Sequence, residues 1–211
     1  DEGGFAPNLP SNEDGLKYMV RAIEGAGYST EEIGIALDVA STEFLKDDGY
    51  HMDGEVLSSD DLVEMYGGWL DAYPILSIED GFGEDDWRGW SAFTKAYGHR
   101  VQTVGDDLFV TQSERLAQGI ELGAANAMLV KVNQVGTVTE TLEAMDLAST
   151  NGMNNVVSHR SGESEDVTIA DFAVGTRAGQ IKTGAPARSD RVAKYNQLLR
   201  IAEDVHEYRS P

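Results

Sequence analysis

Cysteine is absent from the 211 residues, which excludes a disulfide framework and any metal site built on cysteine. No apolar stretch approaches the roughly 18 residues that a membrane span requires, and no signal peptide is visible. Basic residues are also scarce, because 16 Lys and Arg stand against 37 Asp and Glu, which gives a net charge of -21. We therefore expect a cytoplasmic protein without a membrane or nucleic-acid partner, since anionic surfaces would repel it. A high-salt habitat would produce the same acidic excess.

The length sets a limit on the fold. A chain of 211 residues can bury a core of its own, but a closed eight-stranded βα barrel usually needs about 250 residues. The sequence begins at Asp1 without an initiator methionine, on a glycine-rich segment. We expect the later part of a longer protein, in which missing sequence or a partner covers the open edges of the sheet.

Six short apolar runs each end in a charged residue, and the sign of the charge changes once. The runs are 33–37 before Asp38, 75–78 before Glu79, 101–105 before Asp106, 127–130 before Lys131, 156–158 before His159 and Arg160, and 180–181 before Lys182. Such runs alternating with helical patterns predict βα units around a parallel sheet, whose carboxyl ends carry the chemistry. One half of that rim would be anionic and the other cationic.

The segments between the runs predict helices and one hairpin. We expect helices over 12–26, 58–72, 84–97, 111–122, 137–151, 166–176 and 189–206. The first is expected to bury Leu16, Met19, Val20 and Ile23 on one face, with Ser11 or Asn12 as its cap. Two Asp-Gly pairs within 46–56 indicate a hairpin inserted after the first strand.

The three acids at the strand ends favour a magnesium site. Asp38, Glu79 and Asp106 offer the hard oxygen ligands that Mg2+ prefers. Each acid alone would more simply be a helix cap or turn residue, and it is their succession at strand ends that favours the metal.

The basic residues suggest a proton acceptor and an anion site. Lys131 follows a buried run, so desolvation and a nearby cation would suit it as a base, although a strand-end lysine can equally extend to solvent. Arg160 suits bidentate binding of phosphate or carboxylate. A cation, a lysine base and an anion clamp suit proton abstraction beside a carboxylate, followed by elimination. Glu2, in the glycine-rich loop, is the available acid for the leaving group.

Motifs over essentially the whole chain resemble those of the enolase family. They are Asp1 to Asn8 (DEGGFAPN), Ala36 to Ala40 (ALDVA), Ser77 to Asp80 (SIED), Val104 to Leu108 (VGDDL), Leu129 to Gln134 (LVKVNQ), Val157 to Glu163 (VSHRSGE), Gln180 to Gly184 (QIKTG) and Ala193 to Ile201 (AKYNQLLRI). The resemblance implies an α/β fold of the TIM-type (β/α) barrel kind. About six of the eight strands would be present, and residues 1–211 would form an incomplete C-terminal catalytic domain.

The resemblance also implies residue roles in the reversible dehydration of 2-phosphoglycerate to phosphoenolpyruvate, a step of glycolysis and gluconeogenesis. Lys131 would take the C2 proton, and Glu2 would protonate the departing C3 hydroxyl. Asp38, Glu79 and Asp106 would bind Mg2+. Arg160 and Ser161 would bind the phosphate. His159 would line the site, and Lys182 would contact the carboxylate.

The resemblance places the N-terminal domain, the first two barrel strands and further catalytic and metal-binding residues outside this chain. It implies a homodimer when the protein has its full length. Two other hypotheses stay open: that these residues act as a non-catalytic binding or structural piece, and that the protein is another superfamily member acting on a different carboxylate.

Overall fold

The structure is a computed structural model that describes residues 2–205. Its contacts divide the chain into two compact units. We call residues 8–109 and 114–126 the N-terminal unit, and residues 2–7, 110–113 and 127–205 the C-terminal unit.

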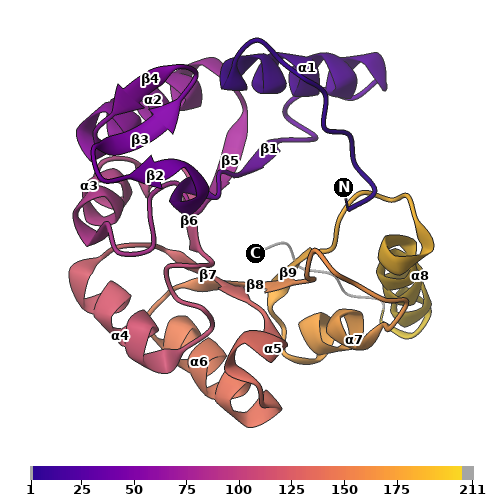
Figure 1. Cartoon of the computed structure of the whole chain (residues 1–211). Coiled ribbons are helices and arrows are strands. Elements are labelled where there is room, and N and C mark those ends of the chain that lie inside the picture. The colour runs from indigo at the N-terminus through magenta and orange to yellow at the C-terminus, as the bar shows by residue number, and fades with distance from the viewer. Residues whose placement is uncertain (1, 206–211) are drawn as a thin grey trace. The chain divides into compact units, whose positions relative to one another are not determined.

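The N-terminal unit is built on three parallel strands in the order β1 (Ile35–Asp38), β5 (Ile75–Glu79) and β6 (Gln102–Gly105). Its helices are α1 (Asn12–Gly25), α2 (Ser59–Ala72), α3 (Trp87–Tyr97) and α4 (Ser113–Leu122), as Figure 1 shows. Edge-to-face ring contacts of Tyr66 with Phe82 and with Phe93 fill the core between the helices and strands. The helices follow strands as the sequence predicts.

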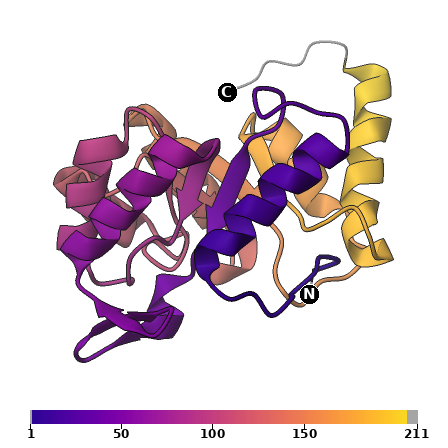
Figure 2. The same cartoon turned by 90° about the horizontal axis from the view of Figure 1, so that it is seen from above.

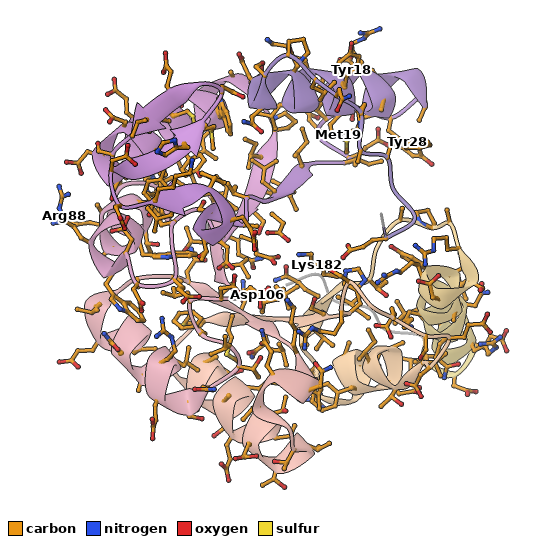
Figure 3. The ribbon with its side chains drawn as sticks, in the orientation of Figure 1. Tyr18, Met19, Tyr28, Arg88, Asp106 and Lys182 are labelled. Carbon is orange, nitrogen blue, oxygen red and sulfur yellow. The ribbon has the colours of Figure 1, made fainter. Side chains whose placement is uncertain are left out.

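Side-chain caps start the first two helices. The Ser11 hydroxyl accepts the backbone N–H of Asp14, as predicted for α1. Ser58 and Asp61 form a reciprocal capping box at α2, so Ser58 precedes the helix instead of opening it. The predicted buried face of α1 is only partly correct, because Leu16 is buried but Met19 is 51% exposed (Figure 3).

The inserted hairpin is a three-stranded antiparallel meander. Its strands are β2 (Leu45–Lys46), β3 (Gly49–Met52) and β4 (Glu55–Leu57), preceded by the short helix η1 (Ser41–Phe44). Figure 2 shows it as a small sheet that projects from the helices of this unit. The turn between β3 and β4 uses Asp53 and Gly54, with φ of 51° and 86°, which is the positive-φ pair that tight hairpins require.

The C-terminal unit has three parallel strands, in the order β7 (Ala127–Val130), β8 (Asn154–Ser158) and β9 (Gly179–Lys182). Its helices are α5 (Val132–Val135), α6 (Val138–Thr150), α7 (Thr168–Gly175) and α8 (Ser189–Asp204). The helices expected from the sequence do not include α5. Across residues 2–205, the six predicted parallel strands are present, and no helix is long and apolar enough to cross a membrane.

Several helix bounds differ from the predictions for local reasons. α3 begins at Trp87 because the carboxylate of Asp86 caps it by accepting the N–H of Gly89. α4 begins at Ser113 because Val110 and Thr111 have φ of 45° and 55°, outside the helical region. The predicted end of the last helix, His206, lies outside the described residues.

Candidate functional site

The three predicted metal ligands lie at the carboxyl ends of neighbouring strands in the N-terminal unit. Asp38 ends β1 and lies opposite Glu79, the last residue of β5. Asp106 follows β6 directly, and Figure 3 shows it far from Arg88, which points outward from α3. Glu79 and Asp106 are only 6% and 8% exposed, whereas Asp38 is exposed. The fold therefore brings these acids to one end of the three strands, as the alternating pattern predicts.

Asp80 connects the loops that follow these strands. Its carboxylate accepts the backbone N–H groups of Asp106 and Asp107 at 2.9 and 2.8 Å. Its own N–H donates to the carbonyl of Val104, and its carbonyl accepts the N–H of Ser41, both at 3.0 Å. The residue has a φ of 43°, a left-handed conformation that aspartate tolerates better than most side chains. One residue thus fixes the loops beside all three predicted ligands.

Carboxylate oxygens of Asp80, Asp106 and Asp107 lie within 4.8 Å of one another, and over residues 2–205 this is the one group of metal-ligand type so close together. Sequence reasoning named Asp106 but missed the other two, and Asp38 and Glu79 stand outside the group. The missed signal was that the acids are doubled, as Glu79-Asp80 and Asp106-Asp107. The pKa of Asp80 is raised to about 7, mainly by burial and also by the neighbouring carboxylates, although the two backbone N–H bonds act to lower it.

The carboxylates that gather at these strand ends fit a divalent cation such as Mg2+. Carboxylate oxygens are its preferred protein ligands. A buried carboxylate is tolerated when it is paired, hydrogen-bonded or bound to a cation, and Glu79 and Asp106 are both buried. The Asp80 oxygens already accept two N–H groups, so this residue orients the loop that carries Asp106.

Lys131 lies at the carboxyl end of β7 in the C-terminal unit, between that strand and α5. Its backbone N–H donates to the hydroxyl of Thr111 at 3.0 Å, and this hydroxyl donates to the Gln134 side chain at 2.8 Å. Thr111 is fully buried in spite of its positive φ. A β-branched residue rarely adopts this conformation, so the surrounding contacts must maintain it.

We expect Thr111→Val to lower the free energy of unfolding by about 1–3 kcal/mol, because the partly buried backbone N–H of Lys131 would lose its acceptor. Valine has the same shape, so the change removes the hydroxyl with little effect on packing. Urea denaturation of the 211-residue chain measures the difference. Thr111→Ser keeps the hydroxyl and serves as the control, and equal stability of the valine variant and the wild type would contradict this role for the hydroxyl.

Glu2, His159 and Ser161 come together in the same unit. The Ser161 hydroxyl donates to Oε1 of Glu2 at 3.0 Å, and Nε2 of His159 lies 3.2 Å from Oε2. His159 follows β8 and is 3% exposed, and its backbone N–H donates to the carbonyl of Lys182. Burial lowers the pKa of His159, while the Glu2 charge opposes this and the nearby cations add to it. The imidazole is therefore predominantly neutral at neutral pH.

Close backbone packing holds the glycine-rich segment that carries Glu2. The Glu2 carbonyl accepts the N–H of Ala185 at 3.1 Å. Gly184, with φ of 79°, lies so close that a Cβ at this position would meet the same carbonyl at 2.8 Å. A side chain at position 184 would therefore displace Glu2.

The other predicted cations lie on adjoining loops of this unit. The Arg160 guanidinium donates to the side-chain oxygen of Asn133, two residues after Lys131, at 2.6 Å. Lys182 is the last residue of β9 and lies opposite Ser158 of β8. The unit therefore holds all six predicted acid, base and substrate-binding residues at the carboxyl ends of its three strands or on segments packed against them. Sequence reasoning missed Thr111 and the buried Arg191, which gave no strand-end signal.

Comparison with known proteins identifies the family. Residues 1–210 match the family described as "Enolase, C-terminal TIM barrel domain". The enolase of Natranaerobius thermophilus is 54% identical over 209 residues, which cover 98% of this chain and 49% of that protein. The chain thus spans about half the length of this curated relative. With its six parallel strands and alternating helices, the chain belongs to the enolase family and is an α/β partial barrel of the C-terminal TIM barrel domain.

Proposed function

We propose that this chain supplies the C-terminal part of an enolase that reversibly dehydrates 2-phosphoglycerate to phosphoenolpyruvate. The observation that carries the proposal is that the side chains of Ser161 and His159 both lie within 3.2 Å of the Glu2 carboxylate, in a unit whose first strand is followed directly by Lys131. A carboxyl group, a hydroxyl and a lysine at strand ends suit elimination from a phosphorylated hydroxy acid.

In this proposal Lys131 removes the proton from C2 of the substrate. Glu2 delivers a proton to the C3 hydroxyl as it leaves as water, and takes a proton from water in the reverse direction. Arg160 and Ser161 bind the phosphate, His159 lines the site, and Lys182 contacts the substrate carboxylate. Arg160 is suited to this task because its planar guanidinium can donate two parallel hydrogen bonds to phosphate oxygens.

Asp38, Glu79 and Asp106 would hold Mg2+, with Asp80 orienting the loop of Asp106. When bound, the ion supplies positive charge that stabilises the negative charge developing on the substrate carboxylate. Mg2+ is our proposal because the donors are all carboxylates. For the complete protein we further propose a cytoplasmic homodimer with a place in glycolysis and gluconeogenesis, and its mass in solution would test the dimer.

A coupled assay of phosphoenolpyruvate formation tests the function. We expect turnover with Mg2+ when the chain is joined to the part of the Natranaerobius thermophilus enolase that it does not match. The 211-residue chain alone is expected to be inactive or very weakly active, because it spans half of that relative. An inactive but folded chimaera would overturn the proposal and favour a non-catalytic binding or structural role. Turnover by the isolated chain near that of a complete enolase would contradict the second expectation.

A further inference from the structure

Arg191, on α8, is a buried cation that the proposed reaction does not use. It is 0% exposed, and its guanidinium reaches three consecutive residues of the loop after β8. Nη1 contacts Nδ1 of His159 and donates to the carbonyl of Arg160 at 2.8 Å, while Nη2 donates to the carbonyl of Ser161 at 2.7 Å. Its Nε lies 3.1 Å from the carboxylate of Asp190. This side chain therefore holds, by hydrogen bonds, the loop that carries the proposed phosphate-binding residues.

The contact with His159 determines where the imidazole can carry its proton. A guanidinium has five N–H donors and no acceptor, and it stays protonated in proteins. Nδ1 of His159 can therefore share a hydrogen bond with Arg191 only through its lone pair. In a neutral ring the hydrogen is then on Nε2. The opposite tautomer would direct an N–H of the ring against an N–H of Arg191 in a buried site, where lost hydrogen bonds are costly.

Nε2 faces Glu2, the proposed acid. With its hydrogen there, the ring presents a donor to Oε2, which lies 3.2 Å away. Oε1 of the same carboxylate accepts the hydroxyl of Ser161, whose carbonyl is held by Arg191. A single guanidinium thus positions the two groups that contact the two oxygens of Glu2.

We propose that Arg191 is a positioning residue that fixes His159 as the neutral tautomer with hydrogen on Nε2, and thereby orients the Glu2 carboxylate. The role of Glu2 rests on the proposed function, but the tautomer does not. The two can fail separately, because ring tautomers are measured without substrate or metal.

Long-range 1H–15N correlation spectra of the histidine-labelled 211-residue chain test the proposal, since a ring nitrogen with hydrogen is distinguished by its 15N shift from one without. His159→Gln identifies the His159 signals by their loss. At neutral pH we expect Nδ1 without hydrogen and Nε2 with it. A hydrogen on Nδ1, rapid averaging between the tautomers or a doubly protonated ring would each overturn the proposal.

Two further variants identify the residue that sets the tautomer. Arg191→Met is expected to shift the His159 ring toward a mixture of tautomers, whereas Arg200→Met, at an exposed arginine of the same helix, leaves it unchanged. Glu2→Gln is expected to keep the hydrogen on Nε2, because the side chain of Glu2 is 32% exposed and Arg191 remains in place. If Glu2→Gln changed the tautomer, Glu2 would be the determinant and the proposal would fail. Should Arg191→Met not fold, the wild-type and Glu2→Gln spectra still decide.

Discussion

Lys131→Ala is expected to lower the turnover of 2-phosphoglycerate by about 10³-fold or more in the chimaera that completes the chain, since a positioned general base typically contributes about 10²–10⁴-fold. Alanine leaves the backbone N–H of residue 131 in place, so its bond to Thr111 is retained. The loss should appear in kcat, because the lysine acts on the reacting proton. Steady-state kinetics with saturating Mg2+ measures it.

Lys95→Ala is the matched control, because Lys95 is an exposed lysine of α3 at which no chemistry is proposed. It should leave kcat and KM unchanged. Circular dichroism of the Lys131 variant must match that of the wild type for its loss of activity to be read as loss of a base. Retained turnover in a folded Lys131→Ala protein would remove the lysine from the proposed mechanism.

Asp80 is expected to make the chain less stable as pH rises toward neutrality. Its pKa is raised from 3.8 to about 7 by burial, so between these values the folded chain holds a proton that the unfolded chain has released. The group therefore stabilises the fold below about pH 4, and this contribution is lost progressively as pH rises through about 7. At about 1.4 kcal/mol for each pH unit, the total change is about 4 kcal/mol.

Urea denaturation of the wild type and Asp80→Asn across this pH range, without divalent ions, isolates the effect. Asparagine does not titrate, so the unfolding free energy of the wild type minus that of Asp80→Asn should fall by about 4 kcal/mol from acidic to neutral pH. Asp60→Asn removes an exposed carboxylate at the start of α2 and serves as the control. Parallel curves for the wild type and Asp80→Asn would show that Asp80 is already ionised when buried.

The strand ends could be predicted because the signal is local. An apolar run followed by a charged residue identifies both the strand and its carboxyl end, and parallel pairing then brings Asp38 and Glu79 opposite each other. The same locality explains the helix caps at Ser11 and Ser58, where a polar side chain satisfies the N–H groups of the next turn.

Features that depend on distant contacts were not predicted. Arg191 and Lys194 lie on a predominantly polar helix and would be expected at the surface, yet both are buried because their N–H groups satisfy carbonyls of the loop after β8. Asp80 was not among the predicted site residues, and only the path of the β6 loop reveals its two N–H partners. No periodicity encodes such contacts.

The hydroxyl of Ser161 and the carboxylate of Glu2 are 159 positions apart in the sequence, and the backbone of Glu2 is anchored to Ala185. Contacts between residues so far apart in the sequence carry a large loop-closure entropy cost, so they form late in folding. During synthesis, the glycine-rich segment therefore lacks the partner of its backbone until β9 and Ala185 have emerged. The proposed acid would be the last of the predicted site residues of its unit to reach its place, and a ribosome-bound chain ending before residue 185 would contain Lys131 but not the anchor of Glu2.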